Sequence, residues 1–314
     1  MKRIINIEEL KNNIEKLSKT LPSLNIDSIY IEQNKEINKI LYSDNNLHEL
    51  RSCSKLLVSM AIGIAIDRKM KVNGKAISLD TEIYPVIEKI VDIRNKNNLS
   101  KIKKWTIRTL LTHTTGYESQ MMSEKYIENI DENKLLDYAL NYDIPYEPNE
   151  RYAYNNVEPF VLSVFFQEAF NINLTDFINE NIFKKLNILE FRWDNYGIYC
   201  PGATGLYLKH SDFHKIGELL LNDGTFNGVE VIPKYWMREL TKLQLETPSA
   251  YKKDRVFPKI GIGYYVFISR DGVIFRDGAN GQYIIVNKDN DILITIMSTE
   301  ENMKNVTEIF RNII

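Results

Sequence analysis

Residues 50–67, LRSCSKLLVSMAIGIAID, decide how the rest of the chain is interpreted. The run from Leu56 to Ile66 is apolar except at Ser59 and Gly63, so a helix over it has no polar side. A helix that is apolar all round lies inside a protein. The run is about half of the ~20 residues that a bilayer span needs. The segment therefore predicts a buried helix.

Ser52 and Lys55 stand at the start of this helix in the pattern Ser-x-x-Lys. Residues three apart share a helix face, with side chains about 5–6 Å apart, so the hydroxyl and the amine can meet. Burial favours the neutral amine, which can take the hydroxyl proton. First-turn amides have no partner in the helix and can donate to an oxyanion. Ser52 and Lys55 are a candidate nucleophile and base; an ordinary N-cap is the alternative for Ser52.

The composition is that of an ordinary globular protein. Its 314 residues are 44% hydrophobic and 26% charged, which excludes a disordered chain and a fibrous repeat. Forty Lys and Arg residues stand against 42 Asp and Glu residues, so a global basic field for nucleic acid or anionic lipid is missing. We expect a small-molecule substrate as partner, with no nucleic acid and no membrane. The sequence carries no signal for an oligomeric state.

Two features predict a cytoplasmic protein. Cys53 and Cys200 show no metal-ligand spacing and make a poor disulfide framework, which favours a reducing compartment. The first nine residues contain two glutamates before any apolar stretch forms, so we expect no signal peptide. Cys53 is turned about 100° from Ser52 on the helix and is expected to pack in the core.

The order of the predicted elements indicates one sheet made from both ends of the chain. Two strands, 28–32 and 37–42, flank a polar turn at Asn34-Lys35 and form a hairpin. Four apolar runs near the C-terminus predict an antiparallel meander: 264–268, 273–276, 282–286 and 292–296. Apolar periodicity predicts helices at 7–20, 134–140, 157–170, 174–186, 212–221 and 300–314, with no strands in the middle of the chain.

These elements predict a single domain of the α/β (α+β) class over residues 1–314. Its sheet comes from residues 24–45 and 258–302, with the terminal helices packed on it. We expect an α/β sheet lobe from 1–45 plus 258–314 and a mostly helical lobe from 46–257.

Four further motifs follow the Ser-x-x-Lys segment in order. Tyr154-Asn155-Asn156 is the only Tyr-x-Asn in the chain and precedes the apolar helix 157–170, although a packed loop tyrosine and an asparagine cap are an alternative. The others are IRTLLTHTTG at 107–116, GELLLNDG at 217–224 and GANGQY at 278–283. In this order the motifs resemble the serine β-lactamase and penicillin-binding-protein superfamily, and within it the class C-like β-lactamase-related esterases and peptidases.

The resemblance implies the β-lactamase/transpeptidase-like fold and an acyl-enzyme mechanism without a cofactor. It makes Ser52 the acylated nucleophile, Lys55 its base and Tyr154 the group that shuttles protons. Asn156 would contact the substrate amide and the lysine, and the amides of Ser52 and Gln282 would form the oxyanion hole. We expect hydrolysis of a small ester, amide or D-amino-acid-type substrate. The alternatives are a true β-lactamase or D-alanyl-D-alanine carboxypeptidase, and a catalytically silent sensor protein.

The third motif departs from the superfamily, where it begins with lysine, histidine or sometimes tyrosine. Here the positions are Ala279, Asn280 and Gly281, which we expect to contact substrate, with Gly281 letting it lie close to the strand. Alanine cannot hold the carboxylate of a β-lactam or of a peptide C-terminus. Arg276, three residues earlier, is a candidate replacement whose direction the following Asp277-Gly278 turn leaves open.

Three histidines are candidates for a functional role. His210 and His214 are four residues apart, as in a zinc helix, but Ser211 resembles a helix N-cap that leaves His210 outside. We therefore expect no metal site. His113 lies in the 107–116 motif without a Gly-x-Ser-x-Gly elbow in the chain, so we expect a hydrogen-bonded structural histidine and not a Ser-His pair.

Overall fold

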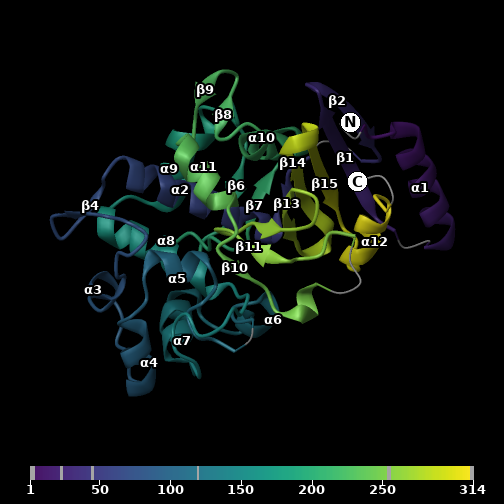
Figure 1. Cartoon of the computed structure of the whole chain (residues 1–314). Helices are drawn as coiled ribbons and strands as arrows, with labels where there is room; N and C mark the ends of the chain where they lie inside the picture. The colour runs from purple at the N-terminus through teal and green to yellow at the C-terminus, as the bar shows by residue number, and fades with distance from the viewer. Residues whose placement is uncertain (1–3, 22–23, 44–45, 119, 253–255, 312–314) are drawn as a thin grey trace. The chain divides into compact units, whose positions relative to one another are not determined.

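The computed structural model describes residues 4–21, 24–43, 46–118, 120–252 and 256–311, drawn as elements in Figure 1. The chain divides into two compact units. Unit 1 contains Met1–Cys53, Leu186–Arg192 and Leu206–Ile314, and unit 2 contains Ser54–Lys185 and Trp193–Gly205.

The described part of unit 1 is built on an eight-stranded antiparallel sheet in the order β10-β11-β12-β13-β14-β15-β1-β2. β1 pairs with β15, with Ile29 opposite Ile296, so both ends of the chain form one sheet as predicted (Figure 1). The strands are β1 (Ile26–Gln33), β2 (Glu36–Leu41), β10 (Leu245–Glu246), β11 (Gly261–Ile262), β12 (Phe267–Ile268), β13 (Val273–Gly278), β14 (Gln282–Asn287) and β15 (Ile292–Ser298).

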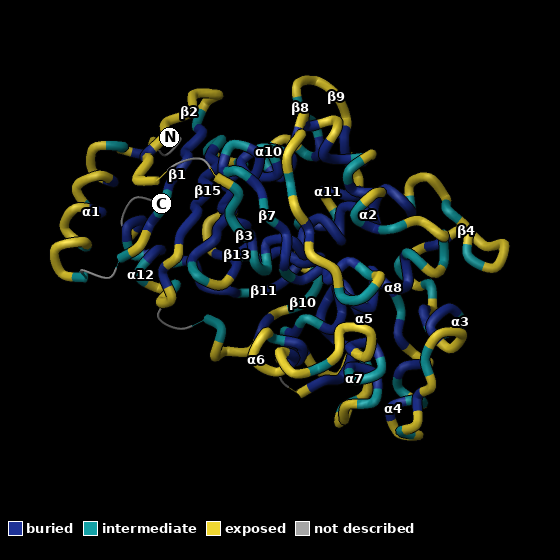
Figure 2. Tube along the Cα trace, turned by 180° about the vertical axis from the view of Figure 1, so that it is seen from behind, coloured by how far each residue is buried: buried dark blue, intermediate teal, exposed yellow. Residues whose placement is uncertain are grey.

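Helices cover this sheet. α10 (His210–Leu221) packs on β14 and β15, where a Cβ on Gly217 would lie 2.6 Å from Leu293 Cδ1, so glycine permits the close approach. α1 (Ile7–Thr20) buries Leu10 and Ile14 and exposes its other side (Figure 2). Its bounds match the prediction. α12 (Met303–Glu308) and α11 (Lys234–Thr241) complete the helices of this unit.

Unit 2 is mostly helical, and its core is α2 (Lys55–Asp67) and α8 (Val157–Phe170). Every residue of α2 from Lys55 to Ala65 is buried, which confirms the predicted buried helix. α8 has the predicted bounds. The remaining elements are α3 (Tyr84–Ile87), α4 (Lys96–Ile102), α5 (Ile107–Leu111), α6 (Glu124–Ile127), α7 (Leu135–Asn141), α9 (Leu174–Ile178), the π-helix Asn179–Phe183, and the hairpin of β4 (Lys71–Val72) and β5 (Lys75–Ala76).

Several boundaries differ from the prediction. Only Phe267–Ile268 of the run 264–268 is a strand, because Tyr265 has a left-handed backbone (φ 67°) that breaks the extended conformation. α10 begins at His210, so the expectation that Ser211 caps it is wrong. α12 is shorter than the predicted helix 300–314, of which residues 312–314 lie outside the described residues.

The middle of the chain also contains short strands, which corrects the prediction of helices alone. β3 (His48–Glu49), β7 (Leu206–Leu208) and β6 (Arg192–Trp193) form a small sheet, and β8 (Thr225–Phe226) pairs with β9 (Val229–Glu230). The units also differ from the predicted lobes, because residues 206–257, expected in the helical lobe, belong to the sheet unit. The packing of α10 on β14 and β15 is the physical reason.

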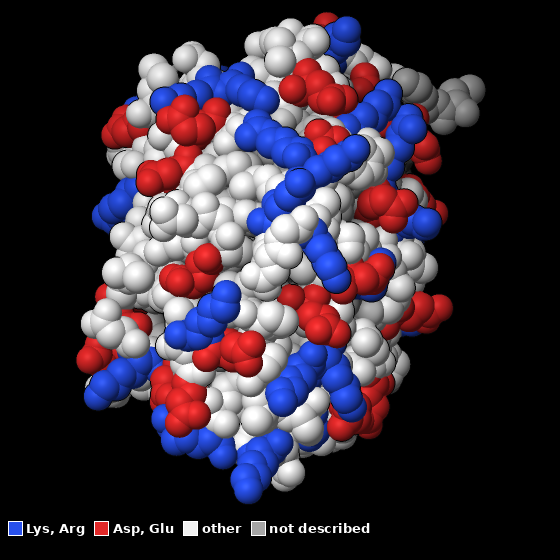
Figure 3. Space-filling view, turned by 90° about the vertical axis from the view of Figure 1, so that its left-hand side faces the viewer, with Lys and Arg blue, Asp and Glu red and all other residues white. Residues whose placement is uncertain are grey.

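On the face shown in Figure 3, Lys and Arg side chains alternate with Asp and Glu, so neither sign dominates that face. Among the described residues, no helix combines the length and the apolar character that crossing a bilayer requires.

Candidate active site

Ser52 lies in the short 3₁₀ turn Arg51–Ser54, which continues directly into α2 at Lys55. The N-cap of α2 is Ser54, so the alternative that Ser52 is an ordinary N-cap is wrong. The Ser54 hydroxyl donates to the carbonyl of Gly202 at 3.3 Å and is buried. Ser52 is partly exposed. Of the two serines, Ser52 is the one that a reagent can reach.

In unit 1, Arg276 holds the backbone of Ser52. Its side chain is fully buried, and Nε donates to the Ser52 carbonyl oxygen at 2.9 Å. Nη1 lies 3.4 Å from the carbonyl oxygen of Tyr265, and the guanidinium lies 5.4 Å from the centroid of the Phe267 ring. The sequence left the direction of Arg276 open. The side chain points into the protein and fixes the position of the candidate nucleophile.

The end of β13 and the start of β14 contact the same backbone. A Cβ on Gly278 would lie 2.5 Å from the Leu50 carbonyl oxygen, so only glycine permits this approach. The Cys53 thiol lies 3.7 Å from the carbonyl oxygen of Arg276 and 3.8 Å from that of Gln282. Cys53 is 2% exposed, as expected for a core side chain. Ser52 is therefore flanked by residues that the sheet positions.

The third motif is a tight turn between β13 and β14. Gly278 pairs with Gln282, so the turn has three residues, of which Asn280 (φ 62°) and Gly281 (φ 85°) have left-handed backbones. Ala279 is exposed at this turn. Gln282 is buried, and its side-chain amide donates to the carbonyl oxygen of Ser298 at 2.5 Å, which ties the turn to β15.

Gly281 serves packing within the protein. A Cβ there would lie 2.7 Å from Val306 Cγ2 and 2.8 Å from Ser298 Oγ. The space that this glycine leaves on its Cβ side is filled by unit 1 itself. The expectation that it clears room for substrate is not supported on that side.

In unit 2, three of the predicted residues lie together. Lys55 is fully buried, and its Nζ donates to Asn156 Oδ1 at 2.7 Å and to the carbonyl oxygen of Ala203 at 3.4 Å. The same Nζ lies 4.9 Å from the centroid of the Tyr154 ring. The Asn156 amide nitrogen donates to the Met122 carbonyl oxygen at 3.0 Å, which turns its oxygen toward the lysine. This unit thus holds the amine between the two key residues of the Tyr-x-Asn motif.

A family model described as Beta-lactamase matches residues 33–313 of the chain. The chain belongs to the β-lactamase family. A comparison with curated proteins found no significant match.

Solved structures of similar fold share little sequence with this β-lactamase-family chain. The octameric penicillin-binding protein homologue from Pyrococcus abyssi has a TM-score of 0.77 at 13% identity, over 98% of this chain and 77% of that one. The D-stereospecific amidohydrolase from Streptomyces sp. has a TM-score of 0.74 at 12% identity, over 96% and 98%. EstCE1, a hydrolase with promiscuous acyltransferase activity, has a TM-score of 0.73 at 13% identity, over 98% of each chain. At identities this low, the structural similarity shows a shared fold and nothing about the activity of this chain.

Sequence reasoning missed one support of the Tyr-x-Asn motif in this β-lactamase-family protein. Glu158 is fully buried in the first turn of α8 and accepts hydrogen bonds from Asn155 at 2.8 Å and Thr115 at 2.6 Å. His113 Nδ1 lies 3.1 Å from its other oxygen, and the His113 ring lies 4.9 Å from the Tyr154 ring. The expectation that His113 is a hydrogen-bonded structural histidine is confirmed. The signal for Glu158 was a charge directly before residues 159–166, which are apolar except at Ser163.

Proposed function

We propose that this protein is a serine hydrolase that forms an acyl-enzyme on Ser52. The observation that carries the proposal is the environment of Lys55, three residues after Ser52. A fully buried amine, held at 2.7 Å by a side-chain amide oxygen, is oriented for proton transfer. The membership of the β-lactamase family supports the same assignment.

In the proposed reaction, Ser52 Oγ attacks the substrate carbonyl carbon while its proton passes to Lys55 Nζ. The backbone amides of Ser52 and Gln282 stabilise the oxyanion. The bond to the leaving group breaks, and Tyr154 relays a proton to that group. Water then attacks the acyl ester, again with proton transfer through Tyr154 and Lys55, and releases the acid. Asn156 orients Lys55 and contacts the substrate amide.

We propose small neutral esters and amides, including D-amino-acid-type amides, as the substrate class. Ala279 offers neither a cation nor a hydroxyl for a substrate carboxylate. The Arg276 guanidinium is buried and donates to the Ser52 carbonyl, which argues against its serving as the substitute. The names of the D-stereospecific amidohydrolase and of EstCE1 agree with amide and acyl-transfer chemistry on this fold.

The test is covalent labelling with a fluorophosphonate, read by intact mass and peptide mapping. We expect one adduct per chain, located on Ser52, and no adduct on Ser52→Ala. Ser54→Ala is the matched control, because Ser54 is a buried serine two residues away and should leave labelling intact. Lys55→Ala should slow labelling by roughly 10²–10⁴-fold, the usual contribution of a positioned base. A chain that takes no label would favour the silent sensor protein.

A further inference from the structure

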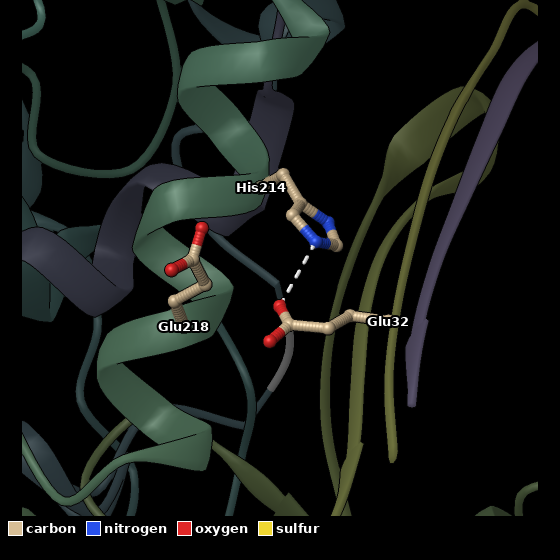
Figure 4. Close-up of side chains that lie close together, drawn as sticks. All are labelled: Glu32, His214 and Glu218. Atoms are coloured by element: carbon tan, nitrogen blue, oxygen red, sulfur yellow. Dashed lines mark ion pairs between the residues drawn. The ribbon is translucent and has the colours of Figure 1, made fainter. Parts of the chain in front are cut away.

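Three side chains that the proposed reaction does not use lie close together in unit 1 (Figure 4). Glu32 comes from β1, while His214 and Glu218 stand one turn apart on α10. One donor atom from each residue lies within 4.8 Å of the other two. An imidazole and two carboxylates are a ligand set that divalent transition-metal ions accept.

One ring nitrogen of His214 contacts Thr295, and this contact turns the other ring nitrogen toward the cluster. Nδ1 lies 2.8 Å from Thr295 Oγ1, and the residue is only 2% exposed. Nε2 faces Glu32 Oε2 at 3.4 Å (Figure 4). Neither of these two buried atoms has a hydrogen-bond partner among the described residues. Buried polar atoms of native proteins are normally paired, and a single cation between these two would satisfy both.

The second carboxylate adds negative charge to the same space. Glu218 is half-buried and stands one turn after His214 on α10, in the same cluster as Glu32. The neighbouring amine of Lys215 is paired with Asp212 at 2.7 Å. A bound cation would remove the repulsion between Glu32 and Glu218 and offset the cost of burying them.

We propose that Glu32, His214 and Glu218 bind one divalent transition-metal ion, with Zn²⁺ preferred. Ligand atoms of a tetrahedral ion with bonds of about 2.0–2.2 Å lie about 3.4 Å apart. The distance between His214 Nε2 and Glu32 Oε2 has this value, 3.4 Å. Three protein ligands leave a fourth position for water. The imidazole selects against Mg²⁺ and Ca²⁺, which prefer oxygen ligands. The proposal reverses the expectation of no metal site.

A hydrogen-bond chain behind His214 is compatible with metal binding. When Nε2 gives its lone pair to the ion, Nδ1 carries the proton and donates to the Thr295 hydroxyl. That hydroxyl then donates to His210 Nε2, 2.9 Å away, and His210 Nδ1 donates to the Ser28 hydroxyl. In this arrangement His214 Nδ1, the Thr295 hydroxyl and His210 Nδ1 each donate to an acceptor. His210 is therefore a positioning residue and not a ligand, and its contact with Thr295 requires the helix start that the sequence analysis misplaced.

The ion would join β1 to α10 within unit 1, so we assign it a structural role in holding this helix on the sheet. The assignment does not depend on the proposed function. Ser52→Ala should bind Zn²⁺ like the unchanged protein, and metal-free protein should still take the fluorophosphonate label on Ser52. The two proposals can therefore fail separately.

The test uses the full chain, freed of metal with a chelator, dialysed and titrated with ZnCl₂ by calorimetry. We expect one equivalent of Zn²⁺ to bind and to raise the melting temperature. Co²⁺ should produce the visible absorption of a tetrahedral site, whereas MgCl₂ should give no binding heat. Binding of much less than one equivalent of Zn²⁺ by the unchanged protein would overturn the proposal.

Variants locate the ion. Glu218→Gln keeps the size of the side chain and should weaken Zn²⁺ binding by more than about tenfold, since loss of second-shell partners alone costs 10–100-fold. Asp212→Asn is the matched control on the same helix, because its carboxylate pairs with Lys215, and its affinity should be unchanged. Should Glu218→Gln not fold, Glu32→Gln gives the same readout. Unchanged affinity in the glutamine variant that folds would place the ion elsewhere and overturn the assignment.

Discussion

Arg276 is the residue that most changes how the candidate active site is interpreted. A cation three residues before the third motif invites the role of a carboxylate-binding group. Its buried guanidinium instead donates to the backbone oxygen of Ser52. A charge-assisted hydrogen bond of this kind is stronger than a neutral one, so it restrains the nucleophile's backbone. We infer a positioning role for Arg276 that acts equally on all substrates.

The first prediction follows for Arg276→Met, which keeps the apolar stem and removes the guanidinium. The Ser52 carbonyl loses its hydrogen bond from the guanidinium, and a hydrogen bond to a charged group contributes roughly 1.5–3 kcal/mol. We expect a lower melting temperature, and specificity constants for a p-nitrophenyl ester and for nitrocefin that fall by the same factor. A loss confined to nitrocefin, which carries a carboxylate, would show that Arg276 binds the substrate.

The second prediction concerns Ala279. Burying a substrate carboxylate without a cation or hydroxyl costs a few kcal/mol, and each ~1.4 kcal/mol is tenfold in the specificity constant. We expect small neutral esters to be hydrolysed at least about a hundredfold more efficiently than benzylpenicillin, and Ala279→Lys to narrow the gap. Ala76→Lys, at another exposed alanine, is the charge-matched control. Fast benzylpenicillin turnover by the unchanged protein would restore the β-lactamase alternative.

At this scale the resemblance to the β-lactamase superfamily predicted which residues come together. Lys55, Tyr154 and Asn156 meet in unit 2 as the motifs implied. The partners of Arg276 and Glu158 could not be predicted, because both depend on which segments pack together. For a strand residue close to a turn, such as Arg276, the sequence alone does not show to which side the side chain points.

At the scale of elements, three Asn-Gly pairs of the described chain lie in tight hairpin turns. Both residues of each pair have positive φ: 50° and 79° at Asn73-Gly74, 48° and 79° at Asn227-Gly228, and 62° and 85° at Asn280-Gly281. Two-residue hairpins require this backbone at Asn73-Gly74 and Asn227-Gly228, whereas Asn280-Gly281 lies in a three-residue turn. The turns differ in their surroundings. A Cβ on Gly228 would meet nothing within 4 Å, whereas one on Gly281 would meet Val306 at 2.7 Å.

The third prediction uses this difference. Gly281→Ala and Gly228→Ala carry the same left-handed strain, roughly 1–2 kcal/mol. Only Gly281→Ala also forces a Cβ against Val306 and Ser298, and overpacking costs typically about 1–3 kcal/mol more. We expect urea denaturation to show that larger loss. Labelling of Ser52 should slow only in Gly281→Ala, because the turn precedes Gln282. Equal losses of stability in the two variants would contradict the packing argument.

Predictability differed among the elements for a physical reason. α1, α8 and the hairpin of β1 and β2 were predicted well, because each is long enough to show its period. The two-residue strands beside Asn73-Gly74 and Asn227-Gly228 show no alternation, so only the turn residues could have revealed them. The predicted start of α10 was wrong because the N-cap residue is Lys209, whose side chain makes no capping hydrogen bond, and not Ser211.

At the scale of the whole molecule, the stability of unit 1 involves a buried histidine chain that joins β1, β15 and α10. His210 stacks on Tyr30 with ring centroids 4.0 Å apart, and its nitrogens contact Ser28 and Thr295. The unit boundaries were not predictable, since nothing in the residues 206–257 shows that α10 packs on the sheet. The hydrogen bonds of His210 nevertheless make the stability of this unit sensitive to pH.

The last prediction is an acid-dependent loss of stability. Burial, followed by the charges of His214, His48 and Lys39, lowers the pKa of His210 to about 3 from 6.5. Above pH 6.5 the imidazole is neutral in both the folded and the unfolded chain, so it contributes no pH dependence. As the pH falls below 6.5, only the unfolded chain takes up the proton, and folding loses up to about 1.4 kcal/mol per pH unit until the folded pKa is reached.

We expect the free energy of unfolding, measured with urea in the presence of EDTA, to fall between pH 6.5 and 5, before most carboxylates titrate. His210→Gln cannot take up this proton. The free energy of unfolding of this variant should therefore change less steeply with pH over the same window, even if its stability at pH 7 is lower. Parallel slopes for the two proteins would mean that His210 is protonated in the folded chain, and would contradict the neutral hydrogen-bond chain to Thr295 and Ser28.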